Sequence, residues 1–539
     1  MKKFFLLMLS AAVIQCKAQI TSIELIQHYT IDDIYNIVDG LGIPDDFVAV
    51  NYEVDFYRIG YTTAHPNGSD VVVSGALCIP SSTACPFPLS SYQHGTIALR
   101  SDAPSYQSAE GLLCALHASS GFVVAAADYI GLGSSPLLHL YVHAESEANT
   151  CVELLRAARD LQGDLGYNLS DELFIWGYSQ GGHATAALQR KLETELTEEF
   201  SLTASAPMSG PYSISGVQAE VLTADEPYPT PGYLPYVVLS YQEAYGTIFN
   251  NINEVFIEPY ASALPDLFDG NHSMGEINDF CPDIPNQMLQ PAFRAAYENE
   301  PEHPMRIALQ DNDVMDWAPQ IPTLLIYCTG DDQVAYENAL VAEEAFYNQG
   351  SISVGTADMG NFNHGVCAPF AMYEGLYFFS QYIESPFSPI VQADIINPSE
   401  ENGGNDGIIN ISVNAPGDWT FEWSNADENL SPENLIPGEY TLTIISENGC
   451  VVSYDYELDL STSIGNLTDT EIRIYPIPAD QFLNIELKEN MAFQVLNLDG
   501  KIVFRSNGKS TNKIDISDWN SGVYFLQTEN GLTRKILVN

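Results

Sequence analysis

Apolar side chains gather in one short run near the middle of the chain. Residues 173–176 read Leu-Phe-Ile-Trp without polar alternation, which is typical of a parallel strand buried on both faces. Gly177-Tyr-Ser-Gln-Gly181 follows directly, and alanine and leucine then recur at roughly helical spacing from Ala184 to Leu196. We therefore expect a strand, a sharp turn and a helix in immediate succession.

The turn in this segment predicts a nucleophile elbow centred on Ser179. On such a turn the serine adopts a strained backbone conformation that leaves no room for side chains two residues on either side. Gly177 and Gly181 are the residues that this crowding requires. The alternative is an ordinary glycine-containing strand-to-helix loop, because a five-residue pattern also occurs by chance in long proteins.

The alternation of strands and helices continues on both sides of this segment. Strands are expected at 52–61, 71–79, 87–92, 122–127, 202–209, 322–328 and 351–356, and helices at 107–119, 143–161, 336–347 and 368–382. Residues 19–50 are expected to form a short helical lead-in. This rhythm predicts an α/β fold with a mostly parallel, doubly wound sheet and crossover helices.

Two parts of the chain break the rhythm. Residues 210–318 are rich in Tyr, Pro and Asn, and because a structureless loop of this length is uncommon, we expect a mainly helical insertion. Its tyrosines suit either a lid over an apolar pocket or the insertion's own core. They include Tyr228, Tyr233, Tyr236, Tyr241 and Tyr245. After about residue 389, short alternating strands predict small all-β units.

The first residues have the three-part pattern of a secretory signal peptide. Met1-Lys2-Lys3 precedes an apolar run from Phe4 to Ile14, and Ala18 is the expected cleavage site. No later stretch approaches the roughly 18 apolar residues of a membrane span. We therefore expect an exported protein that does not cross a membrane.

The charge is strongly one-sided. The chain has 71 acidic and 19 basic residues, which gives a formal net charge of −52. Such a surface repels phosphate backbones and anionic lipid headgroups. Nucleic acid is therefore excluded as an expected partner.

Cysteine usage fits an exported protein, because export permits disulfides. Of nine cysteines, Cys16 lies in the predicted signal peptide, and seven others precede residue 390, so at least one of these has no partner in its own region. The candidate pairs are Cys78 with Cys85 and Cys328 with Cys367. No CxxC motif or Cys/His cluster has the spacing of a zinc site, and neither a metal nor an organic cofactor is expected.

Two polar side chains after later strands complete a catalytic set with Ser179. A serine becomes a nucleophile when a base takes its proton and a third group holds that base. In a doubly wound sheet all three project from the carboxyl ends of strands. Asp331 and His364 each follow a predicted strand, in the Ser-Asp-His order that this geometry requires. Asp331 is preferred to Asp332 because it stands three residues before Val334, where such loops commonly turn back to the protein.

Two backbone N–H groups are expected to hold the oxyanion of the tetrahedral intermediate. Gln180 begins the elbow helix, where the helix dipole also favours negative charge. Thr96, in the loop after the strand at 87–92, is the second expected donor, although a plain turn fits that loop almost as well. Asp128 closes a neighbouring strand and is given no catalytic role, because a loop aspartate is more often a turn-maker.

These residues carry a family resemblance. Residues 19 to about 385 resemble an α/β-hydrolase, and within that superfamily the secretory lipases and related bacterial esterases. The matching segments are Tyr92–Gly95, Asp128–Gly133, Gly177–Gly181, Trp317–Pro322, Asp331–Val334 and His364–Gly365. The resemblance implies a secreted serine hydrolase that cleaves carboxylic esters, either small-molecule or lipid, through an acyl-enzyme on a Ser-His-Asp triad.

The tail resembles two further families. Trp423-Ser-Asn and the segment ending at Cys450 are similar to immunoglobulin-like repeats of surface adhesins of Bacteroidetes. Ile474–Ala479, Val495–Lys501 and Ser521–Phe525 resemble the type A C-terminal sorting domain of the type IX secretion system, which implies that its machinery is a partner. The expected organisation is a signal peptide (1–18), a hydrolase domain (19–388) with an insertion (210–318), an immunoglobulin-like spacer (389–465) and a sorting domain (466–539).

Two rival functions stay open at this point. A serine peptidase uses the same triad on amides, although the sequence offers no clear clamp for a free amino terminus. A surface adhesin could keep a hydrolase fold without activity, which the intact Ser179, Asp331 and His364 argue against. The sequence does not specify the acyl chain length or the oligomeric state.

Overall fold

The structure is a computed structural model, and it describes the hydrolase part of the chain almost completely. The described ranges are 18–41, 50–81, 86–383, 390–399, 404–414, 419–446, 451–460, 472–475, 482–487, 491–497, 501–506, 508–509, 511–517, 519, 522–528 and 533–538. Residues 1–17 of the predicted signal peptide, which include Cys16, lie outside these ranges, as do Cys85 and Cys450. No helix within the described ranges has the length and apolar character needed to span a membrane.

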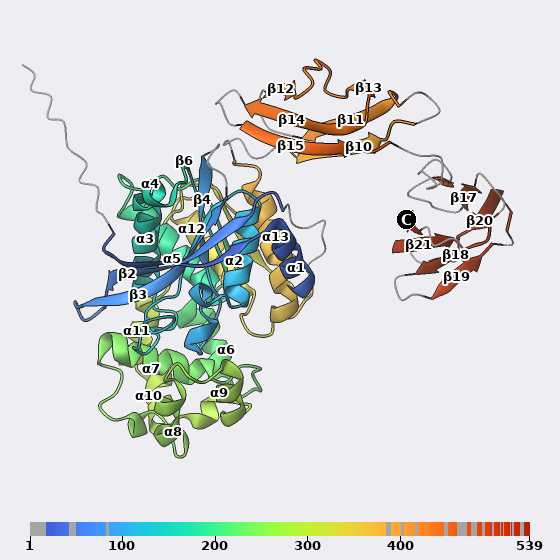
Figure 1. The fold of residues 1–539 in the computed structure, drawn as a ribbon. Coiled ribbons are helices and arrows are strands. Elements are labelled where there is room, and N and C mark those ends of the chain that lie inside the picture. The colour runs from blue at the N-terminus through green and yellow to red at the C-terminus, as the bar shows by residue number, and fades with distance from the viewer. Residues whose placement is uncertain are drawn as a thin grey trace, which may run out of the picture. The chain divides into compact units, whose positions relative to one another are not determined.

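A mixed sheet forms the centre of the hydrolase part (Figure 1). Its strand order is β1-β2-β3-β5-β4-β6-β7-β8-β9. The strands are β1 (Ile20–Tyr29), β2 (Val54–Ala64), β3 (Asp70–Pro80), β4 (Phe87–Gln93), β5 (Val123–Ala127), β6 (Leu169–Tyr178), β7 (Ala204–Met208), β8 (Thr323–Tyr327) and β9 (Val354–Asp358). From β5 to β9 the paired strands run parallel, whereas β1, β2 and β3 pair antiparallel at one edge. The predicted α/β-hydrolase fold, with its mostly parallel sheet, is confirmed.

The expected helical lead-in over residues 19–50 is wrong in its first half. Ile20–Tyr29 is strand β1, which pairs antiparallel with β2, and the helix α1 spans Ile31–Leu41. Ile23 and Leu25 of β1 are exposed, so burial leaves no clear alternation in this edge strand. Its pairing satisfies backbone N–H and C=O groups of β2 that would otherwise remain unpaired at the sheet edge.

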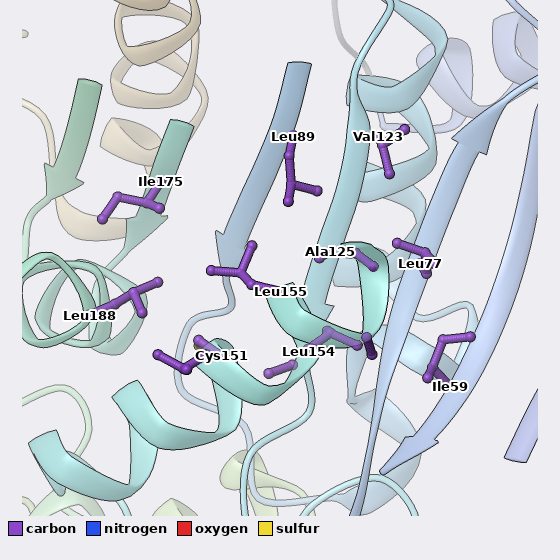
Figure 2. Close-up of a cluster of buried hydrophobic side chains, with 14 of the residues drawn as sticks. Ile59, Leu77, Leu89, Val123, Ala125, Cys151, Leu154, Leu155, Ile175 and Leu188 are labelled. Atoms are coloured by element: carbon purple, nitrogen blue, oxygen red, sulfur yellow. The ribbon is translucent and has the colours of Figure 1, made fainter. Parts of the chain in front are cut away.

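Helices cover both faces of the sheet. They are α2 (Ala109–Ser119), α3 (Ala144–Asp160), α4 (Gln162–Leu165), α5 (Gln180–Thr194), α12 (Glu337–Asn348) and α13 (His364–Phe379). Successive residues of a strand point to opposite faces. Ile175 therefore belongs to the core under α3 and α5, together with Leu154 and Leu188 (Figure 2), while Trp176 belongs to the core under α2 and α13.

The insertion at 210–318 is helical, as predicted. It contains α6 (Ala219–Thr223), α7 (Tyr233–Tyr245), α8 (Tyr260–Leu267), α9 (Met274–Phe280), α10 (Pro291–Asn299) and α11 (Pro304–Asp311). These helices gather at one end of the hydrolase part (Figure 1). They enclose an apolar core of their own, which includes Tyr236, Phe256 and Leu264.

The described strands after residue 390 form small sheets without α-helices in the described segments. They are β10 (Ile390–Ile396), β11 (Gly407–Asn414), β12 (Trp419–Trp423), β13 (Glu433–Leu435), β14 (Gly438–Ser446), β15 (Val451–Leu458), β16 (Ile472–Tyr475), β17 (Phe482–Leu487), β18 (Phe493–Asn497), β19 (Ile502–Arg505), β20 (Thr511–Asp515), β21 (Gly522–Thr528) and β22 (Thr533–Val538). The sheets are β10-β11-β13, β12-β14-β15, β16-β17-β20 and β19-β18-β21-β22. The all-β character expected for this part is confirmed.

One candidate disulfide is present and the other is not. Cys328 and Cys367 form a disulfide across 39 residues of sequence. Cys78 is a free thiol, so the candidate Cys78–Cys85 pair is wrong. The reason is that Cys78 points from β3 into the core under α2, where it is fully buried.

A buried histidine in the same core should make stability depend on pH. His117 stacks on Phe122 with ring centroids 4.2 Å apart, and burial lowers its pKa from 6.5 to about 3. Between these values the unfolded chain binds a proton that the native ring does not, so stability falls as the pH falls. From pH 7 to pH 4 the wild type should lose about 3 kcal/mol more unfolding free energy than His117→Phe. Urea unfolding at both pH values measures this, and equal losses in the two proteins would contradict it.

Candidate active site

Ser179 occupies the turn between β6 and α5. Its backbone has φ 63° and ψ −122°, a conformation that non-glycine residues rarely adopt and that stores strain. The turn is held from the next strand, because the Ser179 N–H donates to the Met208 carbonyl at 2.9 Å. Four consecutive apolar residues before the turn and a helix directly after it force this abrupt change of direction. The geometry is that of the predicted nucleophile elbow.

The glycines on either side of Ser179 allow close approach of neighbouring backbone. A Cβ atom on Gly177 would lie 2.4 Å from the Gln93 carbonyl oxygen, and one on Gly181 would lie 2.0 Å from the same atom. Both distances are far inside van der Waals contact. Since the obstacle is backbone of β4, no side-chain rotation can relieve it.

Gly181→Ala should therefore destabilise the fold and inactivate the protein. We expect a loss of about 3 kcal/mol of unfolding free energy, because overpacking against backbone costs this much. Gly163→Ala is the matched control: it lies on helix α4 with no atom within 4 Å of the added Cβ, and alanine favours a helix over glycine by up to about 1 kcal/mol. Thermal melting compares the two variants, and equal melting temperatures would contradict the crowding argument.

The structure brings Asp331 and His364 together. The Asp331 Oδ2 and His364 Nδ1 atoms are 2.7 Å apart, and the side-chain exposures are 1% for Asp331 and 8% for His364. Asp331 Oδ1 accepts from the backbone N–H groups of Gln333 at 3.0 Å and Val334 at 2.9 Å. The carboxylate is thus fixed by its own loop while its second oxygen faces the imidazole ring.

Asp332 has a different role in the same turn. Its Oδ1 accepts from the backbone N–H of His364 at 3.1 Å, at the first residue of α13. That N–H is one of the groups that a helix leaves without an internal partner. Asp332 therefore supports the start of the helix, and Asp331 contacts the imidazole.

The disulfide joins the two segments that carry Asp331 and His364. Cys328 lies three residues before Asp331, and Cys367 lies three residues after His364. A covalent bond between the residue that follows strand β8 and helix α13 limits the separation of the carboxylate and the imidazole. It therefore stabilises their contact as well as the fold.

His364 also contacts the residue before the elbow serine. The ring centroids of Tyr178 and His364 are 4.8 Å apart, and the Tyr178 hydroxyl donates to the His364 carbonyl at 2.7 Å. Among the described residues, no hydrogen bond joins the Ser179 hydroxyl to the His364 ring. Catalytic hydrogen bonds are often long without substrate and shorten in the complex, so this arrangement remains compatible with proton transfer.

The two predicted oxyanion donors flank the elbow. Gln180 is the first residue of α5. The loop after β4 approaches it closely, because a Cβ on Gly95 would lie 4.0 Å from the Ser179 Cβ, and Thr96 follows Gly95. Neither the Gln180 nor the Thr96 backbone N–H has a hydrogen-bond acceptor among the described residues. Both are thus free to bind a developing negative charge.

An apolar pocket leads from Ser179 into the insertion. It holds about 730 Å³ of empty space, part of it open to solvent. Its lining residues include Val142, Gln180, Val237, Phe293 and Met305. No lining residue that the structure describes is charged, so the pocket suits an apolar group.

The insertion's tyrosines are divided between the wall of the pocket and the insertion's core. Tyr233 lines the pocket, and its hydroxyl donates to Gln333 Oε1 at 3.1 Å, next to the Asp331 turn. Tyr236 and Tyr241 are buried in the insertion's core. Their hydroxyls donate to backbone carbonyls of the hydrolase part, those of Ile97 and Val142, each at 3.0 Å. Helix α7 is therefore tied to the loops around the site.

Asp128 lies outside the pocket and acts as a buried anchor. Its carboxylate accepts from the Ser105 N–H at 2.9 Å and from the Ser74 and Ser105 hydroxyls, each at 2.5 Å. Burial raises the pKa of this carboxyl above its ordinary value. The side chain joins strand β3, the segment around Ser105 and its own loop after β5.

Sequence reasoning overlooked a buried polar cluster behind the elbow. Glu147 and His139 contact the Gln180 side chain, and His183 contacts Glu147. The sequence feature that could have indicated this cluster is Glu147, a charged residue within the mainly buried part of the predicted helix at 143–161. Within the described residues, no group of three or more His, Cys, Asp or Glu side chains has an arrangement that could hold a metal ion.

Comparison with solved structures finds the same architecture elsewhere. A protein from Legionella pneumophila aligns at 28% identity with a TM-score of 0.63, covering 68% of this chain and 98% of that one. The rice cell wall degrading esterase LipA from Xanthomonas oryzae aligns at 31% identity with a TM-score of 0.60, covering 67% and 96%. Candida antarctica lipase A shares the fold at 16% identity and a TM-score of 0.53, covering 68% and 81%. No curated protein matches the sequence significantly.

Two family matches cover most of the described chain. Residues 473–539 match the secretion system C-terminal sorting domain, and residues 105–378 match the secretory lipases. The sorting domain confirms the predicted export through type IX secretion. The chain therefore belongs to the secretory lipase family and is a secreted hydrolase that acts on esters.

Proposed function

We propose that the protein is a serine esterase that cleaves carboxylic esters with an apolar acyl group through an acyl-enzyme. The observation that carries this proposal is the pairing of Asp331 with His364 beside the strained Ser179, at the mouth of an apolar pocket. A strained serine, a buried carboxylate and a base, in this order along the chain, are the components of acyl transfer.

In the proposed reaction Ser179 Oγ attacks the ester carbonyl while His364 takes its proton. Asp331 holds the His364 Nδ1–H, which leaves Nε2 as the base and stabilises the imidazolium that forms. The N–H groups of Gln180 and Thr96 bind the oxyanion. His364 then protonates the leaving alcohol, and a water molecule, activated by the same ring, hydrolyses the acyl-enzyme.

The pocket supports an ester over a peptide substrate. An aminopeptidase needs a negative charge near the free amino terminus of its substrate, and none of the described lining residues is charged. Parallel assays on p-nitrophenyl acyl esters and on aminoacyl and prolyl p-nitroanilides separate the two functions. Faster cleavage of the anilides would refute the esterase proposal.

Acyl chain length should govern the rate until the pocket is filled. Each buried methylene contributes about 0.8 kcal/mol, or about fourfold in kcat/KM. Met305→Trp should remove this gain for long chains and leave acetate hydrolysis unchanged, because Met305 lines the pocket and is 4% exposed. Ile307→Trp is the matched control on the same helix, since Ile307 is 41% exposed. The measurement is kcat/KM across p-nitrophenyl acetate to palmitate, and equal profiles for both variants would count against the acyl assignment.

A further inference from the structure

A buried ion pair lies directly behind the elbow, and the reaction outlined above does not use it. Glu147 on α3 and His183 on α5 are both 0% exposed. Glu147 Oε2 and His183 Nδ1 are 2.8 Å apart, and Glu147 Oε1 accepts from Gln180 Nε2 at 2.7 Å. Residues 180 and 183 are one turn apart, so this carboxylate binds the first turn of the elbow helix at two points.

The Gln180 amide is held by a second acceptor as well. Its Nε2 atom lies 2.9 Å from His139 Nε2, and His139 Nδ1 lies 2.8 Å from the Ile130 carbonyl oxygen. A carbonyl can only accept, so His139 Nδ1 carries the proton and Nε2 is the acceptor. Burial lowers the pKa of His139 to about 4, which keeps the ring neutral near pH 7. Both Gln180 side-chain N–H groups therefore have fixed acceptors.

His183 has an oxygen partner at each of its two ring nitrogens. His183 Nε2 lies 2.9 Å from the Asn312 carbonyl oxygen, while Nδ1 faces the Glu147 carboxylate. Each ring nitrogen of His183 thus faces an oxygen atom, one of a carboxyl group and one of a backbone carbonyl. An uncompensated carboxylate here would oppose the negative charge that develops on the oxyanion.

The same cluster reaches the helical insertion. Asn312 ends helix α11, and its side chain accepts from the Ala144 N–H at 2.8 Å and donates to the Tyr245 hydroxyl at 2.8 Å. Helices α3, α5, α7 and α11 thus meet at one polar cluster. A buried pair of this kind is costly compared with apolar packing, which points to a role other than stability.

We propose that Glu147 and His139 are positioning residues for the oxyanion donor Gln180, with His183 as the counter-ion of Glu147. By holding the Gln180 side chain at both N–H groups, they fix the rotation of the first turn of α5 and hence the direction of its backbone N–H. This inference rests on the proposed roles of Ser179 and Gln180.

The decisive variant is the double replacement Glu147→Leu with His183→Leu. It removes an acceptor of Gln180 without leaving one buried charge unpaired, and apolar replacement of a buried pair is often neutral for folding. Removing one oxyanion donor outright costs about 100-fold to 1000-fold in kcat. Misdirecting it should therefore lower kcat by about 10-fold to 100-fold, with KM within about threefold of the wild type.

Two further variants separate positioning from simple structural support. Glu147→Gln can still accept from Gln180 and can donate to a neutral His183, so it should keep kcat within about threefold of the wild type. Gln189→Leu removes a buried amide on the same helix whose partners are Thr323 and Glu193, away from the elbow. It should leave kcat within about twofold.

The measurements are kcat and KM on p-nitrophenyl butyrate, with thermal melting as the check of folding. Wild-type kcat in the folded double variant overturns the inference, and so does a Glu147→Gln variant as slow as the double variant. His139→Leu removes the other acceptor and must also lower kcat, which keeps the test decisive where the double variant does not fold. Activity retained by Ser179→Ala in the same assay would refute the proposed function instead, so the two failures are distinguishable.

Discussion

Ser179→Ala should abolish ester hydrolysis and leave the protein folded. Removing the nucleophile of a complete triad costs on the order of 10⁶-fold in kcat. The Ser179 hydroxyl makes no hydrogen bond within the described residues, so its removal leaves no buried group unpaired. We therefore expect the unfolding free energy to change by less than about 1 kcal/mol. Hydrolysis of p-nitrophenyl butyrate and thermal melting measure the two effects.

Ser179→Gly removes the same hydroxyl and also relieves the backbone strain at this position. Glycine adopts φ 63° without strain, so this variant should be as inactive as Ser179→Ala and more stable by about 1–3 kcal/mol. A fluorophosphonate probe should label the wild type at Ser179 and neither variant. Absence of labelling in the wild type would support the inactive-adhesin alternative, and hydrolysis by Ser179→Ala would remove Ser179 from the mechanism.

Local patterns in the sequence account for most of the hydrolase fold. The run at 173–176 predicts β6 because four consecutive apolar residues require burial on both faces, and the structure divides Ile175 and Trp176 between the two cores. Asp331 and His364 are expected at one edge of the sheet because each follows a parallel strand, and the carboxyl ends of parallel strands share that edge. Strand β1 was missed because an exposed edge strand carries little periodic signal.

Local sequence patterns do not predict contacts between segments that lie far apart in the sequence. The Glu147–His183 pair joins two helices that pack only in the finished fold, and nothing in the spacing of these residues specifies that contact. The pocket likewise depends on how α7, α10 and α11 pack over the elbow. Tyrosines such as Tyr233 and Tyr236 look alike in sequence, yet one lines the pocket and the other fills the insertion's core. The periodicity of apolar residues predicts which positions are buried, but it does not predict which buried surfaces contact each other.

A second large effect on kcat is expected from the turn after β8, where Asp331 and Asp332 are neighbours. Asp331→Asn should lower kcat by about 10⁴-fold, because an amide at this position no longer fixes the imidazole in the tautomer with Nδ1–H. Asp332→Asn is the matched control. An asparagine Oδ1 can still accept from the His364 N–H, which is the bond that Asp332 makes. This control should keep kcat within about threefold.

The comparison isolates the contact with the imidazole from the general effect of removing a negative charge. Both variants lose one charge from the same turn, and the two residues are adjacent, so their long-range effects on His364 are similar. They differ in that Asp331 Oδ2 lies 2.7 Å from His364 Nδ1, whereas Asp332 accepts a hydrogen bond from the His364 backbone N–H. The measurement is kcat of both variants from pH 5 to pH 9. Equal losses in the two variants would mean that the charge of the turn, and not the Asp331 contact, supports the base.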